Sequence, residues 1–133
     1  ALGRPERGVK LLLDTHILLW VMRDARELSV AARKQIEGAD EVYVSSITLW
    51  ESAIKVATGR LPLAPQVLEA GALRAGFIPL PVTWAHALAV DALPLLHRDP
   101  FDRMLVAQAV SEPMHLLTHD ATLARYSPLV IVA

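Results

Sequence analysis

Short aliphatic segments alternate with longer helical patterns along this chain, and the alternation limits the fold more than any other feature of the sequence. Apolar runs at residues 9–13, 42–44, 77–80 and 115–118 have the length and composition of buried strands, and residues 129–132 form a fifth candidate. Strands that alternate with helices pair in parallel, because each helix carries the chain back across one face of the sheet. The sequence therefore predicts an α/β domain with a parallel central sheet of four to five strands, flanked by helices on both faces.

Helical segments are predicted from apolar periodicity and from the residues that begin or end helices. Ser29 and Thr83 are suitable N-caps, and Pro65 stands where a first-turn proline would stand. A single domain that begins at residue 9 contains all of these segments, and residues 1–8 are interpreted as a loose N-terminal tail. The predicted helices cover approximately residues 15–22, 30–37, 47–58, 65–75, 84–92 and 100–110.

Composition excludes several classes of protein. The 133 residues contain no cysteine, which excludes disulfides, thiolate zinc sites and cysteine nucleophiles. The apolar stretches are far shorter than the ~18 residues of a membrane span, and the N-terminus lacks the apolar core of a signal peptide. We therefore expect a cytoplasmic protein without membrane association. The net charge of −1 argues against a protein that coats nucleic acid, but not against a nuclease with a local site.

Acidic residues stand at or just beyond the ends of predicted elements that share one edge of the sheet. Asp14 ends the first strand, Glu51 lies in the helix after the second, Asp102 is in the first turn of a helix, and Asp120 follows the fourth strand by two residues. Sites on parallel sheets form in the crevice beyond the carboxyl ends of the strands. The sequence thus predicts that these side chains converge, although they are widely separated along the chain.

Each of these residues also has an ordinary structural role open to it. Asp14 and Asp120 could cap the helix or turn that follows, and Glu51 fits a capping-box pattern. Asp102 could be the first-turn acid of a helix that Asp99 caps. None of the four residues identifies a site when it is considered alone.

The electrostatics of the whole group favour a metal site. Carboxylates that meet without a lysine or arginine among them repel one another, by about 4 kcal/mol for a pair ~4 Å apart at an effective dielectric constant of about 20. Either protonation or bound cations must offset this repulsion. Oxygen ligands without histidine or cysteine favour Mg²⁺ or Mn²⁺ over zinc. Such an ion is suited to phosphodiester hydrolysis.

The chain resembles PIN-domain toxins of the VapC type in the segments LLLDTHILLW, SSITLWE, HRDPFDRMLVAQA and LLTHD, which occur in this order. The resemblance extends over nearly the whole chain, and DPFDRMLVAQA is its most specific segment. It implies a PIN-like fold, a homodimer, cleavage of RNA with Mg²⁺ or Mn²⁺, and silencing by a cognate antitoxin. By this resemblance, Asp14, Glu51, Asp102 and Asp120 form the acidic quartet that is catalytic and binds the metal.

Further candidate residues lie beside the quartet. Asp99 is an additional acid that could contact the metal or the substrate. Thr15 and Thr118 match small hydroxyl positions of the family and could orient the ligands. Arg98 and Arg103 flank the segment Asp99–Asp102 and could hold an RNA phosphate or pair with neighbouring acids.

The first predicted helix is a candidate part of a groove for the antitoxin, together with the helix near residues 65–75. Core packing is nevertheless the expected role of the tryptophans on predicted helices, Trp20, Trp50 and Trp84, and the groove is the alternative for the first helix only. The histidines are given no role, since no pair has the HExxH spacing, although His119 adjoins Asp120. The candidate groove residues are Ile17, Leu18, Trp20, Val21 and Met22.

Other functions are compatible with parts of this pattern. A receiver-type signalling domain shares the fold class and binds Mg²⁺, but it needs a late lysine, and no lysine follows Lys55. A haloacid-dehalogenase-type phosphatase needs a second aspartate two residues after the first, where this chain has His16. A non-catalytic PIN-like interaction domain would keep the fold without activity, although all four quartet positions here are acidic.

Overall fold

A parallel sheet forms the centre of the computed structural model, which describes residues 8–133. Its strands are β1 (Lys10–Leu13), β2 (Glu41–Ser45), β3 (Ile78–Leu80), β4 (His115–Thr118) and β5 (Val130–Val132). Their spatial order is β3-β2-β1-β4-β5, and every neighbouring pair is parallel. The predicted parallel sheet is confirmed, and it includes the fifth strand. The predicted tail falls outside the described residues, except for Gly8.

Helices connect successive strands in the described part of the chain. The first helix begins after Asp14, whose side chain accepts a hydrogen bond from the Ile17 N–H. Ser29 and Thr83 cap their helices as predicted. The helices are α1 (Thr15–Arg23), α2 (Val30–Gly38), α3 (Ser46–Ala57), α4 (Pro65–Arg74), α5 (Trp84–Ala92), α6 (Pro100–Ser111) and the 3₁₀ helix η1 (Ala121–Arg125).

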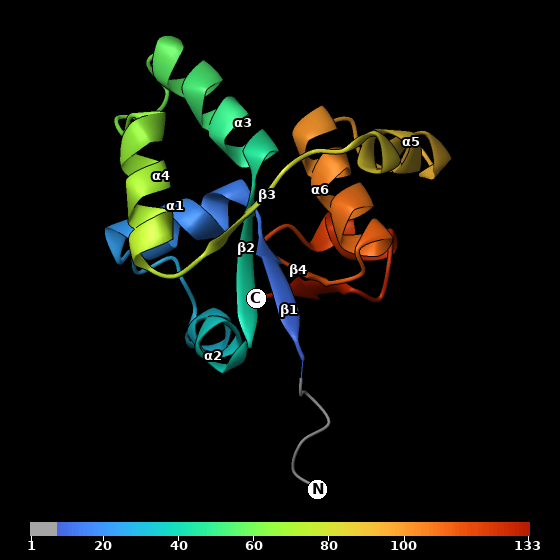
Figure 1. The fold of residues 1–133 in the computed structure, drawn as a ribbon, viewed down its shortest axis with the longest axis horizontal. Coiled ribbons are helices and arrows are strands. Elements are labelled where there is room, and N and C mark those ends of the chain that lie inside the picture. The colour runs from blue at the N-terminus through green and yellow to red at the C-terminus, as the bar shows by residue number, and fades with distance from the viewer. Residues whose placement is uncertain (1–7) are drawn as a thin grey trace, which may run out of the picture.

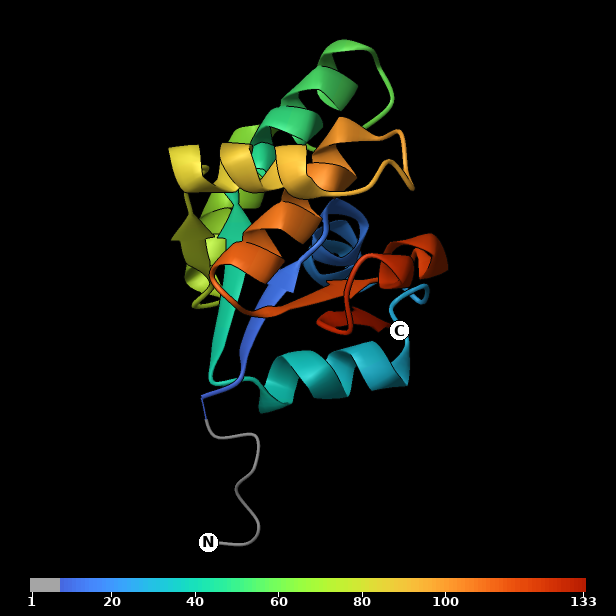
Figure 2. The ribbon, with the colours of Figure 1, turned by 90° about the vertical axis from the view of Figure 1, so that its right-hand side faces the viewer.

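The sheet separates two apolar layers because side chains alternate along each strand. On β1, Leu11 and Leu13 pack on the face covered by α1, α2 and α4, whereas Leu12 packs with α6 and η1 on the other face. The helices are arranged on both sides of the strands (Figure 1), and α5 packs against the outside of α6 (Figure 2). No helix within residues 8–133 combines the length and apolar character needed to cross a bilayer.

The connection from β2 to α3 determines where Glu51 lies. Ser45 ends β2 and caps α3, since its hydroxyl accepts a hydrogen bond from the Ile47 N–H. The helix therefore begins at Ser46, and Glu51 lies in its second turn, beyond the reach of a capping box. The capping interpretation of Glu51 is wrong, and another interaction must explain why this acid is buried.

Candidate active site

A cavity of about 260 Å³ opens at the carboxyl edge of β1 and β4. It brings together three of the four predicted acids, which come from the end of β1, the start of α6 and the segment after β4. The order of the strands explains this convergence, because β1 and β4 are direct neighbours. The cavity is lined by Asp14, His16, Trp20, Asp102, His119 and Asp120.

Asp14 is held rigidly at the floor of this site. Its side chain is 5% exposed, and one carboxylate oxygen accepts the Ile17 N–H at 2.9 Å. The other oxygen accepts a hydrogen bond from Thr118 Oγ1 at 2.5 Å, so a residue 104 positions away fixes its orientation. Burial raises the pKa of the Asp14 carboxyl above its usual range, against the lowering effect of the hydrogen bond from Thr118.

Glu51 lies behind the cavity rather than in its lining. Thr15 Oγ1 donates a hydrogen bond to Glu51 Oε1 at 2.6 Å, and Lys55 Nζ lies 3.0 Å from Oε2. The prediction that the acids meet without a basic residue among them is therefore wrong. The spacing of Glu51 and Lys55 by four positions on one helix was the sequence signal for this pair. Glu51 is buried because it is paired.

The carboxyl of Asp102 is also in a position that disfavours its negative charge. Burial raises the pKa of its carboxyl to about 7, and the negative charges of Asp99, Asp14 and Glu51 add to this effect. One carboxyl of the cluster is thus partly protonated near neutral pH, even with Lys55 present. A cation that displaced this proton would relieve the repulsion.

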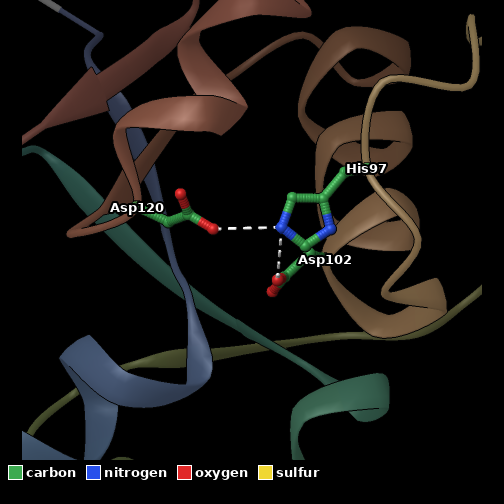
Figure 3. A group of neighbouring side chains, drawn as sticks. All are labelled: His97, Asp102 and Asp120. Carbon is green, nitrogen blue, oxygen red and sulfur yellow. Dashed lines mark hydrogen bonds and ion pairs between the residues drawn. The ribbon is translucent and has the colours of Figure 1, made fainter.

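Asp120 is the most exposed of the four acids and has the opposite electrostatic behaviour. Hydrogen bonds from Thr122 to its carboxylate lower the pKa of Asp120, so it is a stable anion. His97 Nε2 lies 3.1 Å from Asp120 Oδ2 and 3.8 Å from Asp102 Oδ2, so this one ring nitrogen faces both carboxylates (Figure 3). His97 therefore connects two acids from different elements.

The hydrogen bonds of His97 define its role. Its Nδ1 atom accepts the backbone N–H of Asp99 at 3.1 Å, so this nitrogen carries no proton. The ring proton is then on Nε2, where it is donated to Asp120. Although His97, Asp102 and Asp120 lie close enough to surround an ion, a protonated Nε2 cannot be a ligand. No role for His97 was predicted from the sequence, because nothing in the sequence indicates how its loop folds back.

The remaining predicted residues have mixed outcomes. Thr15 and Thr118 contact quartet acids directly. Asp99 caps α6, because its Oδ1 accepts the N–H groups of the first turn at 2.8 and 3.2 Å, and it is not among the cavity-lining residues.

Arg103 donates to the Pro94 and Val90 carbonyls and to the Tyr126 hydroxyl, so it has a structural role and is not free for phosphate. Arg98 is exposed beside another cavity.

The apolar residues of α1 divide between the core and the surface. Ile17 and Leu18 are completely buried in the apolar layer that α1, α2 and α4 cover, so they are core residues and cannot line a groove. Trp20, Val21 and Met22 pack against the edge of this layer and remain partly exposed. The predicted groove can include only these last three residues.

Comparison with known proteins agrees with this geometry. The sequence pattern of the PIN domain family matches residues 11–128, from within β1 to the loop just before β5. The chain belongs to the PIN domain family. The resemblance inferred from the sequence motifs is confirmed, and the match spans the whole sheet except β5.

Relatives of this PIN domain include Ribonuclease VapC22 of Mycobacterium tuberculosis, which is 34% identical over 115 residues, or 85% of this chain and 88% of that protein. Among solved structures, VapBC2 from Rickettsia felis, bound to a DNA fragment from its promoter, has a TM-score of 0.68 at 15% identity and covers 94% of this chain and 98% of that chain. A toxin–antitoxin complex from Klebsiella pneumoniae has a TM-score of 0.66 at 20% identity, covering 92% and 96%. These structures confirm the predicted fold.

Proposed function

We propose that this chain is the toxin of a toxin–antitoxin pair, a ribonuclease that hydrolyses RNA phosphodiester bonds in the cytoplasm with Mg²⁺ or Mn²⁺. The observation that carries the proposal is the convergence of Asp14, Asp102 and Asp120 on one small cavity, with Glu51 buried behind it. The 34% identity to a protein named as a ribonuclease supports the same activity. The domain is proposed to begin at residue 9.

The donor set fits a divalent cation that prefers oxygen ligands. Asp14, Asp102 and Asp120 present carboxylate oxygens to the cavity, and burial, followed by the neighbouring negative charges, raises the pKa of Asp102. Because the His97 ring donates its proton, the donor set contains no free imidazole nitrogen from this loop. This set favours Mg²⁺ or Mn²⁺ over zinc.

The residues of this chain prepare the site before any ion or substrate arrives. A divalent ion at this site supplies positive charge that stabilises a phosphodiester under attack and makes water a better nucleophile. Thr118 holds the orientation of Asp14, and His97 holds that of Asp120. Glu51, neutralised by Lys55, adds a buried carboxylate that is positioned by Thr15.

An RNA cleavage assay tests the proposal directly. We expect the purified chain to cut single-stranded RNA in Mg²⁺ or Mn²⁺, and EDTA or Asp102→Asn to abolish cleavage. Asp91→Asn, which changes an exposed acid on α5 outside the site, is the matched control and should keep full activity. A chain that binds partners but cuts no RNA in either metal would instead be the non-catalytic interaction domain considered above. Cleavage by Asp102→Asn at the wild-type rate would refute the assignment.

The antitoxin is proposed to cover α4 together with its borders with α1 and α3. Met22 packs closely against α4, since a Cβ at Gly71 would lie 2.6 Å from the Met22 Sδ atom. On its side toward α3, α4 exposes Leu73, which is 54% exposed and borders an apolar cleft between α3, α4 and β3. Co-purification with the product of the adjacent gene should be lost in Leu73→Asp and retained in Val30→Asp, a control on α2. Equal capture by both variants would contradict this placement.

A homodimer is proposed to form through the outer face of α5. Trp84 is 90% exposed, Leu95 81% and Leu88 74%, and a cavity of about 390 Å³ lined by Trp50 and Phe101 lies beside them. Apolar side chains exposed together mark an interaction surface. Analytical ultracentrifugation should find a dimer for the wild type and a monomer for Leu88→Asp. A wild-type monomer would contradict the proposal.

A further inference from the structure

Aromatic rings line the candidate active site beside the acids. His16 and Trp20 stand one turn apart on α1, with ring centroids 6.1 Å apart. The His119 ring, which follows β4, contacts the Trp20 ring edge to face, with centroids 5.2 Å apart and an angle of 74° between the planes. All three residues line the same cavity as Asp14, Asp102 and Asp120. We call His16, Trp20 and His119 the ring wall.

Within the described residues, the ring wall has one electrostatic link to the acids, since His16 partly offsets the raising effect of burial on the pKa of Asp14. Both histidines are exposed, and Trp20 is partly exposed. His119 Nδ1 bonds the backbone carbonyl of Ala133 at 3.1 Å, which fixes the ring but leaves the carboxylates untouched. In the part of the chain that the structure describes, no ion pair joins either histidine to an acid of the site. The ring wall is therefore available to a ligand.

We propose that the ring wall binds a nucleobase of single-stranded RNA next to the phosphate that is cleaved, a proposal that rests on the proposed ribonuclease function. Each RNA phosphate is flanked by bases, and unpaired bases stack on aromatic side chains. A cavity of about 260 Å³ is of the order of one nucleotide and is too small for a duplex. Bases within a duplex are already paired and stacked, so the ring wall selects single strands.

Charge supports a base rather than a second phosphate at this position. The cavity is lined by several carboxylates, whereas neither Arg98 nor Arg103 is among its lining residues. Aromatic rings attract a neutral base by stacking without adding charge, and this contact tolerates any base. We therefore expect the ring wall to contribute affinity for single strands without strict sequence preference.

The experiment compares two strands of equal length and charge, one a short single-stranded RNA and the other an abasic phosphodiester. Binding is measured by fluorescence anisotropy in the Asp102→Asn background without metal, where the strand stays intact and one negative charge is removed. In this background, His119→Ala should weaken binding of the RNA roughly tenfold and leave binding of the abasic strand unchanged. His119→Tyr, which keeps an aromatic ring, should bind the RNA within about twofold of the parent.

His115→Ala is the control, since His115 begins the same strand that His119 follows and lies outside the cavity. It should leave RNA binding unchanged. In the active enzyme with Mn²⁺, His119→Ala should raise KM and leave kcat near the wild-type value.

Several results would overturn the proposal. One is that His119→Ala binds the RNA as tightly as its parent does. Another is that His119→Tyr and His119→Ala lose the same amount of RNA affinity. A third is that the parent binds the RNA no more tightly than the abasic strand. The last of these includes the case in which the parent binds neither strand. Failure of the proposed function would look different, because the wild type would then cleave no RNA in metal, whatever the affinities.

Discussion

Replacing Asp102 by asparagine should stabilise the metal-free protein at alkaline pH, although the change removes a candidate metal ligand. Asparagine keeps the shape of the side chain but cannot ionise. In the wild type, burial and the neighbouring acids raise the pKa of Asp102 from 3.8 to about 7. Ionisation of this carboxyl is therefore unfavourable in the folded state and unhindered in the unfolded chain.

The sign and size of the effect follow from proton linkage. Between about pH 4 and pH 7, the folded protein keeps a proton on Asp102 that the unfolded chain has released, so the free energy of unfolding falls as the pH rises. The full shift corresponds to about 4 kcal/mol, at about 1.4 kcal/mol per tenfold change in proton affinity. Because the Asp102 side chain is 23% exposed, solvent screens part of this cost, and we expect about 2–4 kcal/mol.

Urea denaturation in EDTA at pH 5 and pH 8 measures this difference. The free energy of unfolding of Asp102→Asn should exceed that of the wild type at pH 8, and the gap should narrow markedly at pH 5. Asp91→Asn should show no comparable change with pH, since Asp91 is exposed on α5. If Asp102→Asn were less stable than the wild type at both pH values by the same amount, the electrostatic account of the site would be refuted.

Other substitutions test the positioning contacts. Thr118→Val removes the hydrogen bond to buried Asp14 and should lower the free energy of unfolding by about 1–3 kcal/mol in urea; unchanged stability would contradict this. His97→Ala releases Asp120 and should weaken Mn²⁺ binding about tenfold by calorimetry. His97→Gln, which keeps a donor, should lose less, and equal losses would count against a positioning role. Mn²⁺ should raise the Tm of the wild type more than that of Asp102→Asn, and equal increases would contradict the site.

The sequence was sufficient to predict the layers of the fold because local patterns determine them. Asp14 comes at the end of a short apolar run, and a parallel sheet places such residues at one edge. The contact between Asp14 and Thr118 required more, since it depends on β1 and β4 being neighbours. Strand order results from long-range pairing, which the periodicity of a single segment does not encode. The family resemblance supplied that information for Thr118.

The role of a residue could not be predicted from the sequence where it depends on the path of a loop or on the packing of a helix. His97 meets Asp120 because the loop before α6 turns the ring back, where the Asp99 N–H holds it. Ile17 and Leu18 have the same apolar character as the partly exposed residues that follow them, and only the packing of α1 on the sheet separates the two groups. Apolar periodicity identifies a helix, but it does not identify which residues a partner can reach.

Calorimetric titration with Mn²⁺ tests the central claim most directly, since it measures ion binding to the carboxylates without RNA, partner or turnover. We expect the metal-free wild type to bind Mn²⁺ saturably and to release more protons below pH 7, where Asp102 is still protonated, than at pH 9. Asp102→Asn should bind more weakly and release about one proton fewer than the wild type below pH 7. Absence of binding in the wild type, or identical isotherms for the two proteins, would contradict the account.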